Sequence, residues 1–198
     1  MKHTFTIYSD YIWPFCYVGK GIVDELKKEF QIEDIWLPLE IHPETPIEGK
    51  PISSMFPENR LEAMISNLNA FGNKYGIKFN NLSILSNSKY SLLAGEFAKE
   101  HKKFHEYHDA IFRAYFTEGK DIGKLSTILQ ILTNLNLDSK SFEKSLNDNR
   151  YDKNLENTQK LAEEYGISST PTFIINNKHA IVGAQSIDSF REILKNME

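Results

Sequence analysis

The four residues Trp13-Pro14-Phe15-Cys16 constrain the fold of this chain more than any other segment. They follow residues 4–9, which alternate as the side chains of a half-buried strand do. Pro14 suits the first turn of a helix, where its missing N–H would have no partner in any case. An apolar stripe then recurs at four-residue steps: Val18, Ile22, Leu26 and Phe30. The start of the chain therefore predicts a strand, a short loop, and a helix with Cys16 in its first turns.

Cys16 is the only cysteine among the 198 residues, so the chain cannot form an internal disulfide. A strand, a short loop and a Cys-x-x-Cys segment at a helix start form the usual setting for disulfide exchange. Trp13 stands where the first cysteine of such a segment would stand. The sequence therefore predicts the setting for thiol chemistry without the thiol that would begin a dithiol reaction.

Composition excludes several classes of partner. A net charge of -4 provides no basic surface for nucleic acid or for an anionic membrane, and no apolar run is long enough to span a bilayer. Residues 1–5 enter the first strand without the apolar segment of a signal peptide. Because a lone cysteine does not suggest an oxidising compartment, we expect a cytoplasmic protein with neither nucleic-acid nor membrane partners.

Periodicity divides the chain into three parts. Residues 1–50 read as strand, helix and strand, with the second strand at 35–41 and Pro38 favouring an edge position. Residues 51–150 have helical period and little strand character. Residues 151–198 read as a helix, a hairpin turning at Asn176-Asn177, and a final helix. The expected helices and hairpin strands are 57–76, 88–100, 103–115, 122–135, 142–146, 155–165, 171–175, 179–183 and 187–194. The outer parts together form a four-stranded α/β core that the middle part interrupts.

Four further strings carry a resemblance to a known family. They are Ser86-Asn87-Ser88, residues 114–122 (AYFTEGKDI), Thr170-Pro171-Thr172-Phe173 and Gly183-Ala184-Gln185-Ser186. In this order, around an x-Pro-x-Cys segment, they resemble the FrnE-like subgroup of DsbA-family oxidoreductases over essentially the whole chain. The resemblance implies an α/β, thioredoxin-like fold with a large all-helical insertion.

The same resemblance implies roles for individual residues. Trp13 aligns with the nucleophilic cysteine of the family, and Cys16 with the resolving cysteine. Thr170 would hold an extended peptide or thiol substrate through its backbone, and Pro171 would be cis. Cys16 is therefore the candidate catalytic residue, and the candidate substrate-binding residues are Trp13, Pro14, Phe15, Thr170 and Pro171.

Three hypotheses about function remain open. The first is an enzyme of the oxidoreductase class whose degenerate site is limited to single-thiol chemistry at Cys16, unless that thiol is buried and inert. The second is a glutathione-dependent enzyme, because 2-hydroxychromene-2-carboxylate isomerases and kappa-class glutathione transferases look similar in outline; its hydroxyl donor would be Ser9, Tyr11 or Tyr17. The third is a non-enzymatic module that binds a peptide or small ligand. The expected partner is a thiol- or disulfide-containing peptide or small molecule, with no required cofactor and glutathione as a possible one.

Histidines offer two further candidates. His101, His105 and His108 are spaced along one helical face, but no carboxylate or cysteine of the local sequence completes a ligand set, so we expect no metal site. His42 follows the second strand and could lie near Cys16, where an imidazolium would favour the thiolate. Ser186 at the start of the last helix reads as a helix N-cap or as part of a site for a carboxylate.

Overall fold

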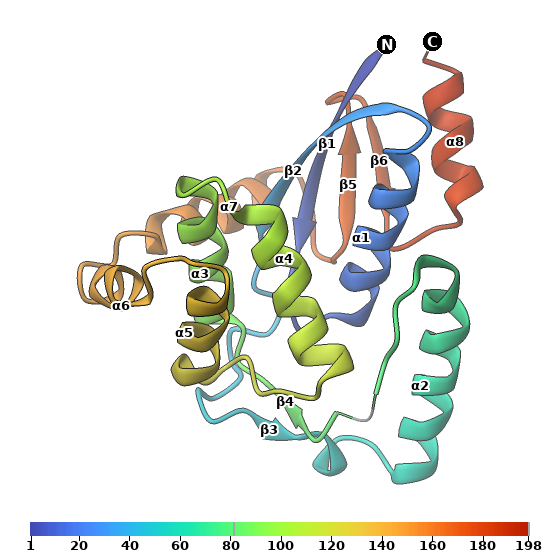
Figure 1. Ribbon diagram of the computed structural model, residues 1–198. Coiled ribbons are helices and arrows are strands. Elements are labelled where there is room, and N and C mark those ends of the chain that lie inside the picture. The colour runs from blue at the N-terminus through green and yellow to red at the C-terminus, as the bar shows by residue number, and fades with distance from the viewer. Residues whose placement is uncertain (81, 198) are drawn as a thin grey trace.

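A four-stranded sheet forms the centre of the molecule in the computed structural model, which describes residues 1–80 and 82–197 (Figure 1). The middle strand β1 runs parallel to β2 and antiparallel to β5, and β5 pairs antiparallel with β6. In spatial order the strands are β2 (Gln31–Pro38), β1 (Lys2–Ser9), β5 (Thr172–Ile175) and β6 (His179–Val182). The sheet thus joins the two ends of the chain, as the sequence predicts.

Helices cover both faces of this sheet. On one face Phe5 of β1 and Phe173 of β5, both fully buried, pack against Phe190 of α8 (Ile187–Lys195). Helix α1 (Pro14–Leu26) connects β1 to β2 and lies on that same face. On the other face Tyr8 and the residues after β2 pack against α7 (Asp152–Glu164). Side chains on the two faces of β1 therefore pack into two separate apolar layers.

The second strand differs from its prediction. It covers Gln31–Pro38 rather than residues 35–41, because Lys2 pairs with Gln31 and the two parallel strands then stay in register as far as Ser9 and Pro38. β2 is an edge strand, as Pro38 indicates. Its first half carries partly exposed polar residues, so the apolar pattern that marks a strand is weak there.

The middle of the chain is helical with one small exception. Its helices are α2 (Glu58–Gly72), α3 (Lys89–Glu100), α4 (Phe104–Phe112), α5 (Leu125–Asn134) and α6 (Ser139–Asn147). Short 3₁₀ turns cover Ile52–Ser54 and Asn73–Tyr75, and a π-helical turn, Arg113–Thr117, extends α4. Two-residue strands β3 (Lys50–Pro51) and β4 (Ile84–Leu85) pair antiparallel. Among the described residues, no helix has both the length and the apolar character needed to cross a membrane.

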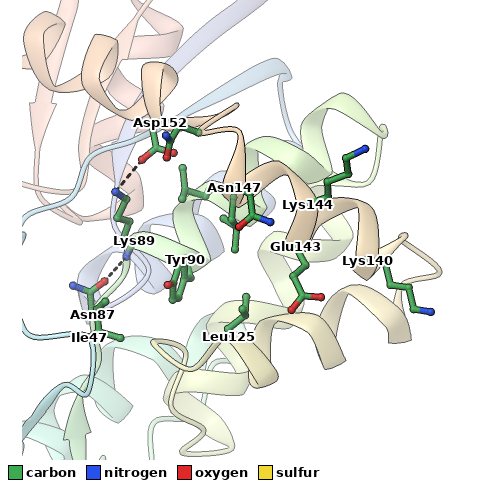
Figure 2. A pocket seen from close by; sticks show the side chains of 13 residues that line it. Ile47, Asn87, Lys89, Tyr90, Leu125, Lys140, Glu143, Lys144, Asn147 and Asp152 are labelled. Carbon is green, nitrogen blue, oxygen red and sulfur yellow. Dashed lines mark hydrogen bonds and ion pairs between the residues drawn. The ribbon is translucent and has the colours of Figure 1, made fainter.

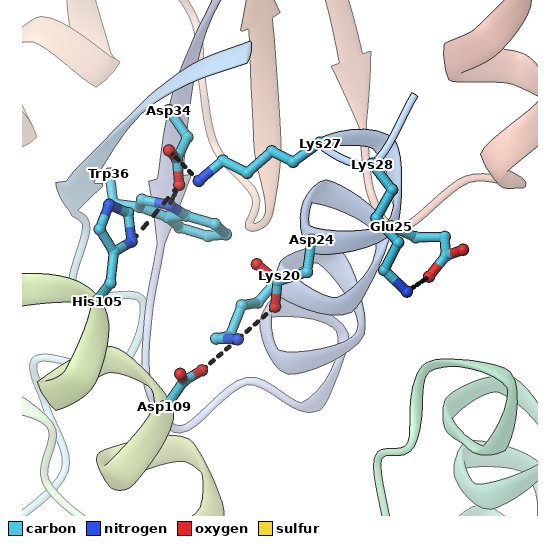
Figure 3. Close-up of polar contacts among 9 residues, drawn as sticks. All are labelled: Lys20, Asp24, Glu25, Lys27, Lys28, Asp34, Trp36, His105 and Asp109. Carbon is cyan, nitrogen blue, oxygen red and sulfur yellow. Dashed lines mark hydrogen bonds and ion pairs between the residues drawn. The ribbon is translucent and has the colours of Figure 1, made fainter. Parts of the chain in front are cut away.

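Ion pairs join α4 to α1, and the end of α1 to β2 (Figure 3). The Lys20 ammonium of α1 contacts Asp109 of α4 and lies 2.5 Å from Asp24. On β2, the carboxylate of Asp34 lies 2.5 Å from Lys27 and accepts a hydrogen bond of 2.7 Å from the Trp36 indole. Burial raises the pKa of Asp34, but these two partners outweigh it and the pKa is lowered overall. The helical segment is thus anchored beside the first helix.

Candidate functional site

The loop between β1 and α1 places the 13–16 segment at the start of a helix. Trp13 is the extended residue before α1, with φ -99° and ψ 117°, and Pro14 is the first helical residue, as predicted. The Trp13 side chain is 36% exposed, and its ring lies 6.4 Å from the His42 ring between centroids. Phe15 meets Phe71 of α2 edge to face. Trp13 is therefore the aromatic side chain of this segment that solvent reaches most.

Cys16 lies beneath this surface. Its side chain is 0% exposed, and its sulfur accepts the Asp10 N–H at 3.5 Å. Burial raises the pKa of the thiol to about 12. The hydroxyls of Thr170 and Ser9 lie near enough to oppose part of that rise in pKa, although neither reaches normal hydrogen-bond geometry among the described residues. At neutral pH Cys16 is a buried, protonated thiol, so the geometry supports the inert alternative over the reactive one.

The Thr170-Pro171 peptide bond is cis, and this loop lies against the first helix. A Cβ at Gly19 of α1 would come within 3.3 Å of Pro171 Cγ and 2.9 Å of Phe173 Cζ, so the helix and the loop approach closely at a residue without a side chain. The Thr170 hydroxyl faces Cys16. The structure thus brings the 13–16 segment and the predicted substrate loop together.

Thr170 also has unpaired backbone groups. Among residues 1–80 and 82–197, neither its N–H nor its C=O takes part in a main-chain hydrogen bond, whereas the C=O of the next residue, Pro171, accepts from Gly183 at 2.8 Å. An extended peptide could pair with such groups as a strand does. Thr170 as a whole is 5% exposed.

Asp10 is the site residue that the sequence analysis missed. Its carboxylate is fully buried and accepts the N–H of Ile12 at 3.3 Å and the N–H of Ile41 at 2.9 Å. Burial raises the pKa of Asp10 to about 6, and the Ile41 hydrogen bond opposes part of that rise. An aspartate that directly follows an apolar strand and precedes the motif is the signal that could have identified it. Asp10 ties the motif loop to the loop after β2.

Three buried hydroxyls surround this carboxyl and the thiol. Ser9 and Thr170 face the sulfur of Cys16, and Ser88, at the start of α3, faces Asp10. None of the three oxygens has a hydrogen-bond partner of normal geometry among the described residues. Since buried polar groups are usually paired, this cluster is unusual for a region that serves packing alone. The cluster can hold a proton near neutral pH, at Asp10.

The other predicted donors point elsewhere. The Tyr11 hydroxyl lies 3.1 Å from His108 Nδ1, and both side chains are buried. Tyr17 is stacked on Phe112 with its ring centroid 5.1 Å away. His42 lies beside Trp13, as expected near the rim, and its Nδ1 is 3.0 Å from Glu44.

The histidines of α4 and its neighbour do not converge. His101 Nδ1 lies 2.9 Å from the Phe97 carbonyl oxygen, and His105 faces Asp34 at 3.8 Å. In the described part of the chain no three His, Cys, Asp or Glu side chains form a group that could hold a metal. Ser186 is the N-cap of α8, where its oxygen accepts the Ser189 N–H at 3.3 Å.

Known proteins are similar to this chain over nearly its whole length. The uncharacterized protein YwbO of Bacillus subtilis is 32% identical over 192 residues, which cover 95% of this chain and 94% of YwbO. The crystal structure of a probable DsbA oxidoreductase from Streptomyces coelicolor superimposes with a TM-score of 0.89 at 21% identity, covering 98% of this chain and 89% of that one. A 2-hydroxychromene-2-carboxylate isomerase superimposes with a TM-score of 0.80 at 18% identity, covering 98% and 95%.

The two solved structures show that the fold is shared. Because their sequence identities to this chain are only 21% and 18%, they show nothing beyond the fold. The family assignment comes from the sequence: residues 4–195 match the family of DSBA-like thioredoxin domains. The match includes the 13–16 segment, Asp10 and the Thr170-Pro171 loop. This chain therefore belongs to the family of DSBA-like thioredoxin domains.

Proposed function

We propose that this protein binds a thiol-containing peptide or a small thiol such as glutathione beside Trp13 and Pro171, and that it does not catalyse dithiol–disulfide exchange. The observation that supports the proposal is that the sulfur of the single cysteine is buried and has a raised pKa. Exchange begins with attack by an accessible thiolate, and Cys16 is 0% exposed with its pKa raised to about 12. Single-thiol chemistry at Cys16 would first require the start of α1 to open.

The candidate site keeps groups that could bind a ligand without reacting with it, namely the Thr170 backbone and the Trp13 side chain. The backbone of Thr170 offers one donor and one acceptor that no main-chain group of the described residues uses. Trp13 belongs to the segment whose Cys16 faces the Thr170 hydroxyl, and its side chain is 36% exposed. Sulfur packs favourably on aromatic rings, with a contribution of about 0.3–1.5 kcal/mol. A ligand thiol can therefore rest on the indole at the position where a family member with a cysteine would bond to it covalently.

The glutathione-dependent isomerase or transferase has less support. That chemistry needs a hydroxyl beside the ligand thiol, and Trp13 supplies none at the first motif position. The Tyr11 hydroxyl is engaged with His108, and the Ser9 hydroxyl faces the buried Cys16 sulfur. Glutathione therefore enters the proposal as a ligand and not as a co-substrate.

A disulfide-reductase assay tests the catalytic half of the proposal. The native protein, Cys16→Ser and Trp13→Cys are compared with an insulin-type disulfide substrate and a dithiol reductant. We expect the native protein and Cys16→Ser to match the protein-free rate, and Trp13→Cys to exceed it because it restores the attacking thiol on the same scaffold. Native turnover that disappears in Cys16→Ser would show that Cys16 does react and that the proposal is wrong.

Calorimetry tests the binding half. S-methylglutathione and an S-methylated cysteine pentapeptide serve as probes, since neither can form a disulfide. We expect binding of at least one probe, weakened in Trp13→Ala. Trp36→Phe is the matched control, because the Trp36 side chain is 4% exposed and contributes almost nothing to the surface that a ligand meets. Binding by neither probe, or equal binding in Trp13→Ala, contradicts the proposal.

A further inference from the structure

Two hollows in the surface lie outside the candidate site. One, of about 660 Å³, opens between α3, α5 and α6, and charged side chains of both signs line it (Figure 2). The other, of about 720 Å³, lies between the end of α7 and the hairpin of β5 and β6. It differs from the first because one of its walls is β6, the strand at one edge of the sheet.

The hollow beside β6 lies on the face of the sheet that packs against α7, which we call the outer face. Helix α7 covers this face at Tyr8 and Leu37 and leaves the part beside β6 open. Two apolar side chains that line the hollow, Tyr165 and Val182, are 71% and 55% exposed. Apolar side chains gathered around a hollow are typical of a surface that meets another molecule.

The two edges of the sheet differ in what their backbones offer. On β2, Pro38 has no N–H, and the Trp36 carbonyl oxygen accepts a hydrogen bond from the Lys99 ammonium. On β6, Ala180 and Val182 are exposed, and among the described residues the strand pairs with β5 alone. An edge whose N–H and C=O groups are open is a template for another strand. The β6 edge is therefore better suited than the β2 edge to extend the sheet.

The hairpin determines which backbone groups of β6 point away from β5. The Gly183 N–H donates to the Pro171 carbonyl oxygen at 2.8 Å. Bonded and non-bonded pairs alternate along an antiparallel ladder, so the odd-numbered residues of 179–183 bond to β5. The N–H and C=O groups of the even-numbered residues 180 and 182, and the C=O of residue 178, therefore point away from β5.

Two backbone groups at this edge already have partners. The Val182 carbonyl oxygen accepts a hydrogen bond of 2.9 Å from Gln185 Nε2. The Lys178 N–H donates to the Ile175 carbonyl oxygen at 3.0 Å, within the turn. Over residues 1–80 and 82–197, no hydrogen bond involves the four others: the Lys178 C=O, the Ala180 N–H and C=O, and the Val182 N–H. The edge thus offers two donors and two acceptors in a fixed order.

These four groups match one another across a two-fold axis. When two copies of β6 run antiparallel with Ala180 opposite Ala180, each Ala180 N–H meets the Ala180 C=O of the other copy. Each Val182 N–H then meets the Lys178 C=O of the other copy. The four hydrogen bonds use every open group once and neither of the occupied ones. A register with Ala180 opposite Val182 would instead need the carbonyl oxygen that Gln185 already contacts.

We propose that two copies of this chain associate through β6, antiparallel and with Ala180 on the two-fold axis, so that their sheets become continuous. Side chains fit this register, because Ala180 is small where the copies are nearest, and the aliphatic stem of Lys178 lies opposite the exposed Val182 of the other copy. The turn before β6 is preshaped, since Asn176 and Asn177 have φ 50° and 55°, the left-handed values of a tight hairpin. This surface is separate from the proposed thiol site, so either proposal can hold without the other.

Sedimentation velocity over a range of protein concentrations tests the association. An interface of this size is weak, so we expect a monomer at about 1 µM and a growing fraction of dimer towards about 500 µM. Ala180→Pro removes the N–H on the axis, and an edge strand tolerates proline where its N–H faces solvent. Loss of two of the four hydrogen bonds should raise the dissociation constant about tenfold or more. Ile35→Lys, on the same face at the opposite edge, is the matched control and should leave the dimer unchanged.

Cysteine cross-linking tests the register. In Ala180→Cys the two Cα atoms across the axis lie about 5.5 Å apart, within reach of a disulfide. In Val182→Cys they lie about 13 Å apart, which is too far. We expect mild oxidation to link two copies of Ala180→Cys and to leave Val182→Cys unlinked. The native Cys16 adds no link, because it is buried.

Each outcome supports or overturns the proposal. A native protein that stays monomeric at every concentration overturns it and leaves the edge to a strand of another protein. A dimer that a folded Ala180→Pro does not weaken, or that Ile35→Lys weakens as much, means that the copies meet elsewhere. Faster linking of Val182→Cys than of Ala180→Cys refutes the register. Circular dichroism verifies folding, and if Ala180→Pro does not fold, the cross-linking pair decides.

Discussion

Replacing Asp10 by asparagine should make the stability of the protein less sensitive to pH. The Asp10 carboxyl is fully buried, and its pKa rises from an ordinary 3.8 to about 6 because burial disfavours the charged form. A raised pKa means that the folded state favours the protonated acid. The associated stability is fully present below pH 3.8 and is lost as the pH rises through 6.

The size of the effect follows from the two pKa values. Complete loss amounts to about 3 kcal/mol, and about 2 kcal/mol of it falls between pH 4.5 and pH 8. An asparagine does not titrate, so Asp10→Asn avoids this loss. Its amide can accept from only one of the two N–H groups, Ile12 or Ile41, that the carboxylate now satisfies. The missing hydrogen bond costs about 0.5–1.5 kcal/mol at every pH.

Urea unfolding at pH 4.5 and pH 8, followed by circular dichroism, measures both contributions. The stability of Asp10→Asn relative to the native protein should rise by about 2 kcal/mol between the two pH values. Asp148→Asn, at an exposed helix end, is the matched control and should show no such change. A relative stability of Asp10→Asn that is the same at both pH values would refute the reasoning, because it would mean that Asp10 is charged in the folded protein throughout.

Three further predictions concern packing and charge around the site. Cys16 should resist a thiol reagent such as DTNB in the native protein, since a pKa of about 12 instead of 9 leaves about a thousandfold less thiolate; labelling as fast as in guanidinium would contradict this. Gly19→Ala should lower the free energy of unfolding in urea by about 1–3 kcal/mol, because its Cβ would lie 2.9 Å from Phe173 Cζ; an unchanged midpoint would mean that the helix and the strand separate easily. Asp34→Asn should destabilise the protein more at pH 7 than at pH 3, since the Lys27 ion pair lowers the pKa of Asp34 and its contribution is lost in acid; thermal unfolding at the two pH values measures this, and equal losses would argue against the ion pair.

The elements with strong periodicity could be predicted from the sequence. Helix α1 begins at Pro14 and buries Val18, Ile22 and Leu26, because these apolar residues recur at four-residue steps and so lie on one face of the helix. The start of β2 could not be predicted, since that strand lies at an edge and its first residues carry no apolar alternation. Helix α5 begins at Leu125 rather than at residue 122, because Asp121 accepts the Gly123 N–H and forms a turn there.

From the residues alone, only those parts of the candidate site that are neighbours in the sequence could be predicted. Trp13 and Cys16 are neighbours along one segment, and the resemblance supplied Thr170 and Pro171. The environment of Asp10 depends on the Ile41 N–H and on Ser88, which lie 31 and 78 residues further along the chain. No local pattern indicates that these groups meet.

The composition of the candidate site is unfavourable for packing alone, which is consistent with the proposed binding function. A buried carboxyl with its pKa raised to about 6 reduces stability at neutral pH. The Ser9, Ser88 and Thr170 hydroxyls, which have no hydrogen-bond partner among residues 1–80 and 82–197, reduce it further. Apolar residues of similar size in these positions would pack without either penalty. Unfavourable groups of this kind gather at functional sites, where a ligand completes their interactions. With an indole at position 13 and Cys16 as the single cysteine, the interactions left for a ligand to complete are hydrogen bonds and aromatic contacts, which are the interactions that the proposed binding function requires.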